Sequence, residues 1–189
     1  GRPDLAPRFY VGETQALWCD DFEADKGWSV TVSGGEVGDW VRGQPLGLGG
    51  DPLGAYSGQL AMGTRFDDAH SSLSFPGHYR PGLRQSLISP PIDTQGSRQL
   101  RLRFMRSLSV EDGSFDEARV SAQGSVLWEN IGTQGGSFHT LDSAWSRQTL
   151  RAWSLDGRSD AQFAFYLRSD DAIELGGWTI DDVCVDAPL

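Results

Sequence analysis

Two cysteines lie near opposite ends of the chain, where they could join its first strand to its last. Cys19 and Cys184 are the two cysteines of the sequence, and most of the chain separates them. Two interpretations are open: two unrelated buried thiols, or one disulfide, which would indicate an oxidising compartment. Neither cysteine belongs to a CxxC motif, so zinc-ribbon and thioredoxin-type chemistry are excluded.

Four carboxylates close to these cysteines could bind a cation. Asp21 and Glu23 follow the first apolar stretch, and Asp181 and Asp182 lie in the last one. If the cysteines face each other across two antiparallel strands, Asp21 falls opposite Asp182, with about 5 Å between the Cβ atoms. Like charges so close repel by ~3 kcal/mol at an intermediate dielectric. We therefore expect these four residues to hold a structural calcium ion, unless they only face water or pair with arginine.

The last strand changes its alternation at the same place. Trp178 and Ile180 share one parity, whereas Val183 and Val185 share the other. A β-bulge at Asp181 and Asp182 would restore a single apolar face. If the strand bulges, Asp181 takes the metal position in place of Asp182.

The sequence contains few combinations of residues that could support catalysis. The three histidines, His70, His78 and His139, form no HExxH motif, and no GxSxG motif occurs. The acidic pairs Asp67–Asp68 and Asp170–Asp171 qualify for glycoside hydrolysis by residue type alone. We therefore expect no enzymatic activity in this chain and keep a cryptic hydrolase as the last alternative.

Seven tryptophans raise the possibility of carbohydrate binding, because indole faces stack on sugar rings. Four of them fall within apolar strand patterns, so we expect them in the core: Trp18, Trp28, Trp40 and Trp178. Trp128, Trp145 and Trp153 flank long loops instead. These three are the candidate ligand-binding residues if the domain recognises a sugar.

The composition limits the partners and the architecture. A formal net charge of −10 over 189 residues disfavours nucleic acid and anionic membranes. No apolar run reaches the ~18 residues that a membrane-spanning helix needs. The chain begins at Gly1 without a methionine, and we expect a module of a longer chain. We expect residues 1–14 to form a linker and residues 15–189 to form one domain.

Short alternating stretches dominate the chain and predict strands. Leu100, Leu102 and Phe104 share one face of a strand. In the same way, Phe163, Phe165 and Leu167 alternate with Ala164, Tyr166 and Arg168. Glycines and prolines separate these stretches, and no amphipathic helix longer than about two turns is evident. One apolar face per strand predicts an all-β fold of two antiparallel sheets packed face to face.

The order of the motifs resembles one known family. The chain is similar to the MAM-like jelly-roll domain found at the C-terminal end of immune inhibitor A-type secreted metalloproteases and in other bacterial extracellular proteins. The residues that carry this resemblance are DDFE from Asp20, GW at Gly27, GDW at Gly38, YSGQLAMGT from Tyr56, SLISPPIDTQG from Ser86, the central hairpin with Glu111 and Asp116 at its acidic positions, FYLRSDD and GGWTIDDVCV.

The resemblance implies a jelly-roll β-sandwich whose first and last strands pair, with a structural calcium near the terminal strands. It also implies a secreted, non-catalytic accessory or adhesion module that binds or positions an extracellular protein or glycan. A carbohydrate-binding module is the alternative function. Accordingly, we expect calcium as the single cofactor, an extracellular location, and neither nucleic-acid binding nor membrane insertion.

Overall fold

The computed structural model describes residues 13–33, 38–66 and 75–189, and over these ranges the chain is built from short strands. In chain order the elements are β1 (Thr14–Asp20), β2 (Ser29–Val32), β3 (Trp40–Gly43), β4 (Ala61–Thr64), β5 (Arg84–Ile88), β6 (Arg101–Val110), β7 (Glu117–Ala122), β8 (Ser125–Glu129), β9 (Thr140–Leu141), β10 (Ser146–Arg151), the 3-10 turn η1 (Trp153–Leu155), β11 (Phe163–Arg168) and β12 (Gly177–Pro188). No helix within these ranges has the length and apolar character to span a bilayer.

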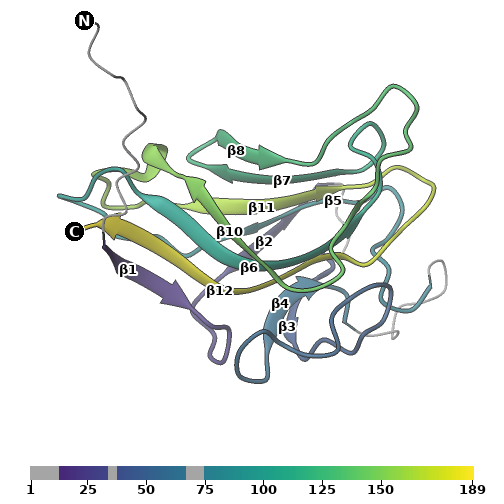
Figure 1. Ribbon diagram of the computed structural model, residues 1–189, viewed down its shortest axis with the longest axis horizontal. Helices are drawn as coiled ribbons and strands as arrows, with labels where there is room; N and C mark the ends of the chain where they lie inside the picture. The colour runs from purple at the N-terminus through teal and green to yellow at the C-terminus, as the bar shows by residue number, and fades with distance from the viewer. Residues whose placement is uncertain (1–12, 34–37, 67–74) are drawn as a thin grey trace, which may run out of the picture.

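The strands form two antiparallel sheets that pack face to face as a jelly-roll β-sandwich, as predicted. The larger sheet has the order β10-β6-β12-β4-β3, with β1 also paired to β12 and β9 to β6. The smaller sheet has the order β2-β5-β11-β7-β8. Figure 1 shows the two layers, with β8, β7 and β11 above β10, β6 and β12. The predicted pairing of the first and last strands is confirmed, because β1 runs antiparallel to β12.

The core lies between the sheets and follows the predicted alternation. Leu102 and Phe104 of β6 are buried, and so are Phe163 and Phe165 of β11. Trp178 sits at the centre, where its ring meets Phe165 at 5.5 Å between centroids. Two of the predicted core tryptophans, Trp40 and Trp178, are buried, whereas Trp18 and Trp28 pack against the core from its margin.

The loop of residues 44–60, which joins β3 to β4, packs against part of the outer face of the larger sheet. Asp51 in this loop accepts a hydrogen bond from the Thr179 hydroxyl, and the carbonyl of Gly54 accepts one from Trp145 Nε1. Thr179 and Asp181, which point to this face of β12, are both buried. On β10, at the other side of the same sheet, half-buried and exposed residues alternate.

The outer face of the smaller sheet is more open. Along β5, β7 and β11 a buried residue alternates with a half-buried or exposed one. This is the pattern of a sheet with one face on the core and the other toward solvent. The outer face of the smaller sheet therefore carries a row of partly exposed side chains along each of these strands.

Candidate functional site

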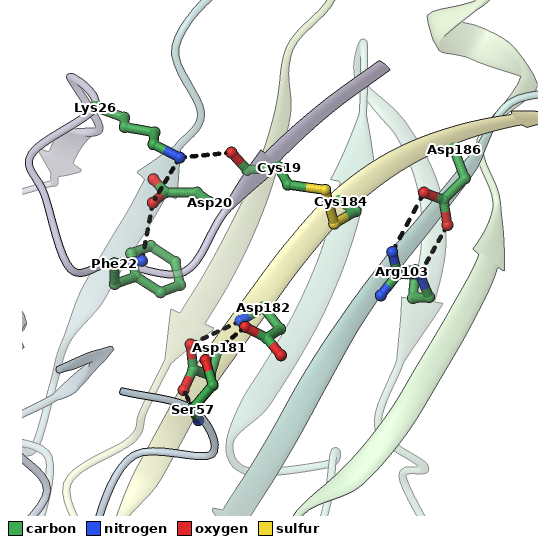
Figure 2. The surroundings of a disulfide bond; sticks show 10 residues. All are labelled: Cys19, Asp20, Phe22, Lys26, Ser57, Arg103, Asp181, Asp182, Cys184 and Asp186. Carbon is green, nitrogen blue, oxygen red and sulfur yellow. Dashed lines mark hydrogen bonds and ion pairs between the residues drawn. A yellow bond between two sulfur atoms is a disulfide. The ribbon is translucent and has the colours of Figure 1, made fainter. Parts of the chain in front are cut away.

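Cys19 and Cys184 form a disulfide across the β1–β12 pair (Figure 2). They are register partners with 4.1 Å between their Cα atoms, so the predicted register of the two strands is correct at this point. The predicted bulge is also present. The β12–β6 register shifts between Asp181 and Cys184, and Asp182 adopts a positive φ of 47°.

The predicted pairing of Asp21 with Asp182 is wrong, because β1 ends one residue too early. The last register pair is Asp20 with Val183. The Asp20 carboxylate accepts hydrogen bonds from the Phe22 N–H at 2.9 Å and from the indole of Trp28 at 2.7 Å. This local turn draws the chain away from the sheet and leaves Asp21 exposed. The repulsion between Asp21 and Asp182 on which the calcium prediction rested does not arise.

Asp181 and Glu23 hold the end of the 44–60 loop from two sides. Asp181 Oδ2 accepts the backbone N–H groups of Tyr56 and Ser57, at 2.9 and 3.0 Å. Glu23 Oε1 accepts those of Gln59 and Leu60, at 2.7 and 2.8 Å. Calcium binding by Asp21, Glu23, Asp181 and Asp182 stays a prediction. In this structure, two of the four carboxylates bind backbone donors of a loop.

Asp182, the residue after Asp181 in the bulge, adds two contacts to the attachment of the 44–60 loop. Asp181 Oδ1 accepts the N–H of Asp182 at 2.7 Å, and Asp182 Oδ1 accepts the hydroxyl of Ser57 at 2.7 Å (Figure 2). Burial raises the pKa of Asp181 to about 6, although hydrogen bonds from Ser57, Asp182 and Tyr56 oppose the shift. The bulge therefore aims two successive carboxylates at one loop.

A second group of carboxylates lies at the end of the sandwich away from the chain termini. Glu111, Asp116 and Asp170 each place an oxygen within 4.8 Å of the other two, the one such group of three found among the described residues. The sequence marked Glu111 and Asp116 as acidic positions of the central hairpin and Asp170 as half of an acidic pair. It did not connect them, because the three residues belong to two loops that meet only in the fold. The other acidic pair, Asp67–Asp68, lies outside the described residues, as does His70.

The three candidate ligand-binding tryptophans do not form one platform. Trp128 faces inward, where its ring packs edge-on against Trp178 and under the Arg106 guanidinium. Trp145 packs against Tyr56 of the covering loop. Trp153 is 58% exposed and carries Arg151 over its ring. Trp145 and Trp153 flank the two ends of β10, so an extended strand of about 20 Å separates them. A sugar-binding role of any of them stays a prediction.

The open face of the smaller sheet contains a groove that the sequence did not reveal. We call it the sheet groove, and its lining residues are Ile88, Ser121, Gln123, Gly124, Gln162, Phe163 and Ala164. Its volume is about 230 Å³. Ala164 is the register partner of both Ile88 on β5 and Ser121 on β7, so these three residues form one row across the sheet. The groove exists because two members of this row have small side chains.

An aromatic ring stands beside the sheet groove in the next row. Tyr166 lies two residues beyond Ala164 on the same face of β11, between Ser86 on β5 and Arg119 on β7. The Arg119 guanidinium stacks on the ring at 4.6 Å from its centroid and binds Glu117 at 2.6 Å. On the other side of Tyr166 in this row lies the small Ser86. The half-buried Tyr166 ring is therefore held in place by Arg119.

A second hollow lies at the edge of the sandwich between β2 and β3. Its volume is about 200 Å³, and Trp28, Trp40 and Arg42 are among its lining residues. Trp28 is fixed there by its hydrogen bond to Asp20, and Arg42 donates to the carbonyl of Phe22 at 3.2 Å. Trp28 and Arg42 are thus engaged in holding the chain together, whereas the indole N–H of Trp40 has no hydrogen-bond partner among the described residues.

The chain is similar in sequence to part of one known protein and in fold to several solved domains. It is 31% identical over 166 residues to Bacillopeptidase F of Bacillus subtilis (strain 168), an alignment that covers 86% of this chain. The alignment covers 10% of that relative, so the chain spans about a tenth of its length. No family model matches the chain.

Solved structures share the fold at low sequence identity. The K1 cleaved adhesin domain of Lys-gingipain from Porphyromonas gingivalis W83 has a TM-score of 0.58 and 17% identity, over 94% of this chain and all of that one. The K3 domain of the same protein has a TM-score of 0.56 and 15% identity, over 92% and 99%. At such identities the likeness establishes the jelly-roll sandwich and leaves the ligand to be argued from the site.

Proposed function

We propose that this chain is a non-catalytic recognition module of a secreted protein and that it binds carbohydrate in the sheet groove. The observation that carries the proposal is the position of the Tyr166 ring beside a groove over Ala164, on the outer face of the smaller sheet. An aromatic wall next to a shallow polar groove suits a ring that has an apolar face and a polar rim.

The chemistry of the groove fits neutral hydroxyl groups. Ser121, Gln123 and Gln162 line it, and hydroxyl and amide side chains both donate and accept hydrogen bonds. The amide nitrogen of Gln162 is bound to the carbonyl of Ser89 at 2.8 Å, which holds the side chain in place. A net charge of −10 adds repulsion against anionic ligands. A neutral sugar is the ligand class that meets both conditions.

The size of the groove sets the part of the ligand that it would hold. Sites for drug-sized molecules have volumes of roughly 300–1,000 Å³, and the groove has about 230 Å³. We therefore expect one sugar ring to enter it and the rest of an oligosaccharide to lie along the open sheet face. Such a site binds and positions a polymer, and it needs no acid–base pair.

The secreted, modular context is supported by two observations. The Cys19–Cys184 disulfide is typical of chains that fold in oxidising compartments. The match to Bacillopeptidase F, which by its name is a peptidase, spans only a tenth of that protein. We infer that this domain serves as an accessory part of a larger extracellular protein, where it would bring the rest of that protein to a glycan surface.

A glycan array followed by titration calorimetry tests the proposal. Tyr166→Ala removes the aromatic wall, and Ala164→Gln fills the groove with a neutral side chain. Each change should weaken binding of the best array hit at least tenfold, which corresponds to about 1.4 kcal/mol. Ala164 is half-buried on the outer face, so its replacement leaves the core intact.

Two control variants separate the groove from the other candidate sites. Arg42→Gln alters the hollow at the sandwich edge, and Trp153→Ala removes the exposed tryptophan. Both should bind like the wild type. An array without hits, or loss of binding in the controls while Ala164→Gln binds normally, contradicts a sugar site in the sheet groove.

A further inference from the structure

Three acidic side chains meet where the chain crosses between the two sheets. Glu111 directly follows β6 of the larger sheet, and Asp116 directly precedes β7 of the smaller one. Asp170 lies in the loop from β11 to β12, where the chain crosses from the smaller sheet to the larger one, so the three residues belong to two of the crossings between the sheets. Figure 1 shows both loops at the end of the sandwich opposite the C-terminus. Their carboxylate oxygens lie within 4.8 Å of one another.

The Asp116 carboxylate is fixed by two donors. Its Oδ2 accepts a short hydrogen bond from the hydroxyl of Tyr79, a fully buried side chain, and its Oδ1 accepts the N–H of Asp170 at 2.9 Å. Each carboxylate oxygen has a further lone pair that these bonds do not use. Burial raises the pKa of Asp116 to about 6, although the hydrogen bonds from Tyr79 and Asp170 lower it.

Glu111 has no such donors. It is 3% exposed, and its Oε2 is buried without a hydrogen-bond partner among the described residues. Burial raises the pKa of Glu111 to about 7, and the nearby charges of Asp116 and Asp170 add to the shift. A buried carboxylate with an oxygen that no donor reaches, placed against two others, is costly in its ionised form unless a cation compensates for it or it takes up a proton.

We propose that Glu111, Asp116 and Asp170 bind a calcium ion that joins the two inter-sheet crossings. Carboxylate oxygens are the ligands of hard cations, and no nitrogen or sulfur ligand belongs to this group. Ca²⁺ accepts many oxygen ligands in a flexible geometry, whereas Mg²⁺ demands a near-ideal octahedron and gives up its water reluctantly. Three carboxylates from two separate loops, with oxygens within 4.8 Å of one another, therefore suit calcium better than magnesium. The hydroxyl of Tyr79 and the backbone N–H of Asp170 hold the Asp116 carboxylate in place.

This site differs from the calcium site expected near the terminal strands, and it is independent of sugar binding in the sheet groove. The ion would link the loop after β6, the loop after β11 and, through Tyr79, the segment that leads into β5. The disulfide holds the sandwich at β1 and β12, and calcium would hold its far end.

Titration of chelator-treated protein with calcium chloride tests the site by calorimetry and by thermal unfolding. The wild type should bind calcium and gain about 5–10 °C in Tm at a hundredfold excess over Kd. Magnesium at the same concentration should give a smaller shift. Glu111→Gln and Asp170→Asn should each bind one ion fewer than the wild type. Without calcium, Glu111→Gln should melt above the wild type, because the buried repulsion is relieved.

Glu23→Gln is the matched control, because it makes the same Glu-to-Gln replacement as Glu111→Gln but near the terminal strands. It should leave the calcium bound at Glu111 unaffected. Asp170 is the most exposed of the three, so Asp170→Asn keeps the test valid if Glu111→Gln folds poorly. A wild type that binds no calcium, or an Asp170→Asn variant that binds as many ions as the wild type, overturns the proposal.

Discussion

The carboxylate of Asp181 lies 3.0 Å from the backbone nitrogen of Ser57, although 124 residues separate the two positions. Together with the bond to Tyr56 N–H, this contact fastens the 44–60 loop to the bulge of β12. The bulge is therefore the anchor of a loop that packs on part of the larger sheet. The proposed sugar site lies on the other sheet, away from this loop.

Asp181→Ala should destabilise the protein by about 2–4 kcal/mol, because it leaves two backbone N–H groups without an acceptor. Urea unfolding measures the change. Hydrogen exchange should accelerate at Tyr56 and Ser57 and stay unchanged in β11. Asp21→Ala is the control, since Asp21 is exposed, and it should change stability by less than about 0.5 kcal/mol. Equal effects of the two variants would show that Asp181 does not anchor the loop.

Reduction of the disulfide should lower stability by about 2–5 kcal/mol, because the bridge closes a loop of 165 residues. Denaturant unfolding with and without a reducing agent gives the difference. A Cys19→Ala, Cys184→Ala double variant should match the reduced wild type. Two reactive thiols in unreduced, denatured protein would contradict the bridge.

Asp51 should make the protein less stable as the pH rises. Burial raises the pKa of Asp51 to about 8, and the hydrogen bond from Thr179 opposes the shift only in part. Between about pH 4 and pH 8 the folded state therefore binds more protons than the unfolded state, and stability falls across that window. Asp51→Asn cannot ionise, so it should exceed the wild type by ~1–3 kcal/mol at pH 8.5 and match it near pH 4. Parallel pH profiles of the two proteins would contradict the shift.

The architecture was predictable from sequence because strand alternation reports burial directly. Phe163, Phe165 and Leu167 are inward, as their period of two requires. The parity change in the last strand located the bulge at Asp181–Asp182. By contrast, Leu150 is the one apolar residue among the six of β10, so the alternation was too weak to predict a strand there.

The candidate sites were less predictable, since they depend on contacts between distant segments. The end of β1 is set by the side chain of Asp20, which turns the chain before Asp21 can pair. The sheet groove needs Ala164 beside Ser121, a register that no motif encodes. The Glu111–Asp116–Asp170 group combines two loops, and it emerges only when both sheets are in place.

The central claim, that the open sheet face binds a sugar, is tested most directly by a crystal structure with the oligosaccharide that binds most tightly on the array. The account predicts a sugar ring over Ala164 with its apolar face toward Tyr166 and its hydroxyls near Ser121 and Gln162. A sugar bound instead at Trp153, or between Trp28 and Trp40, with the sheet groove empty would contradict it.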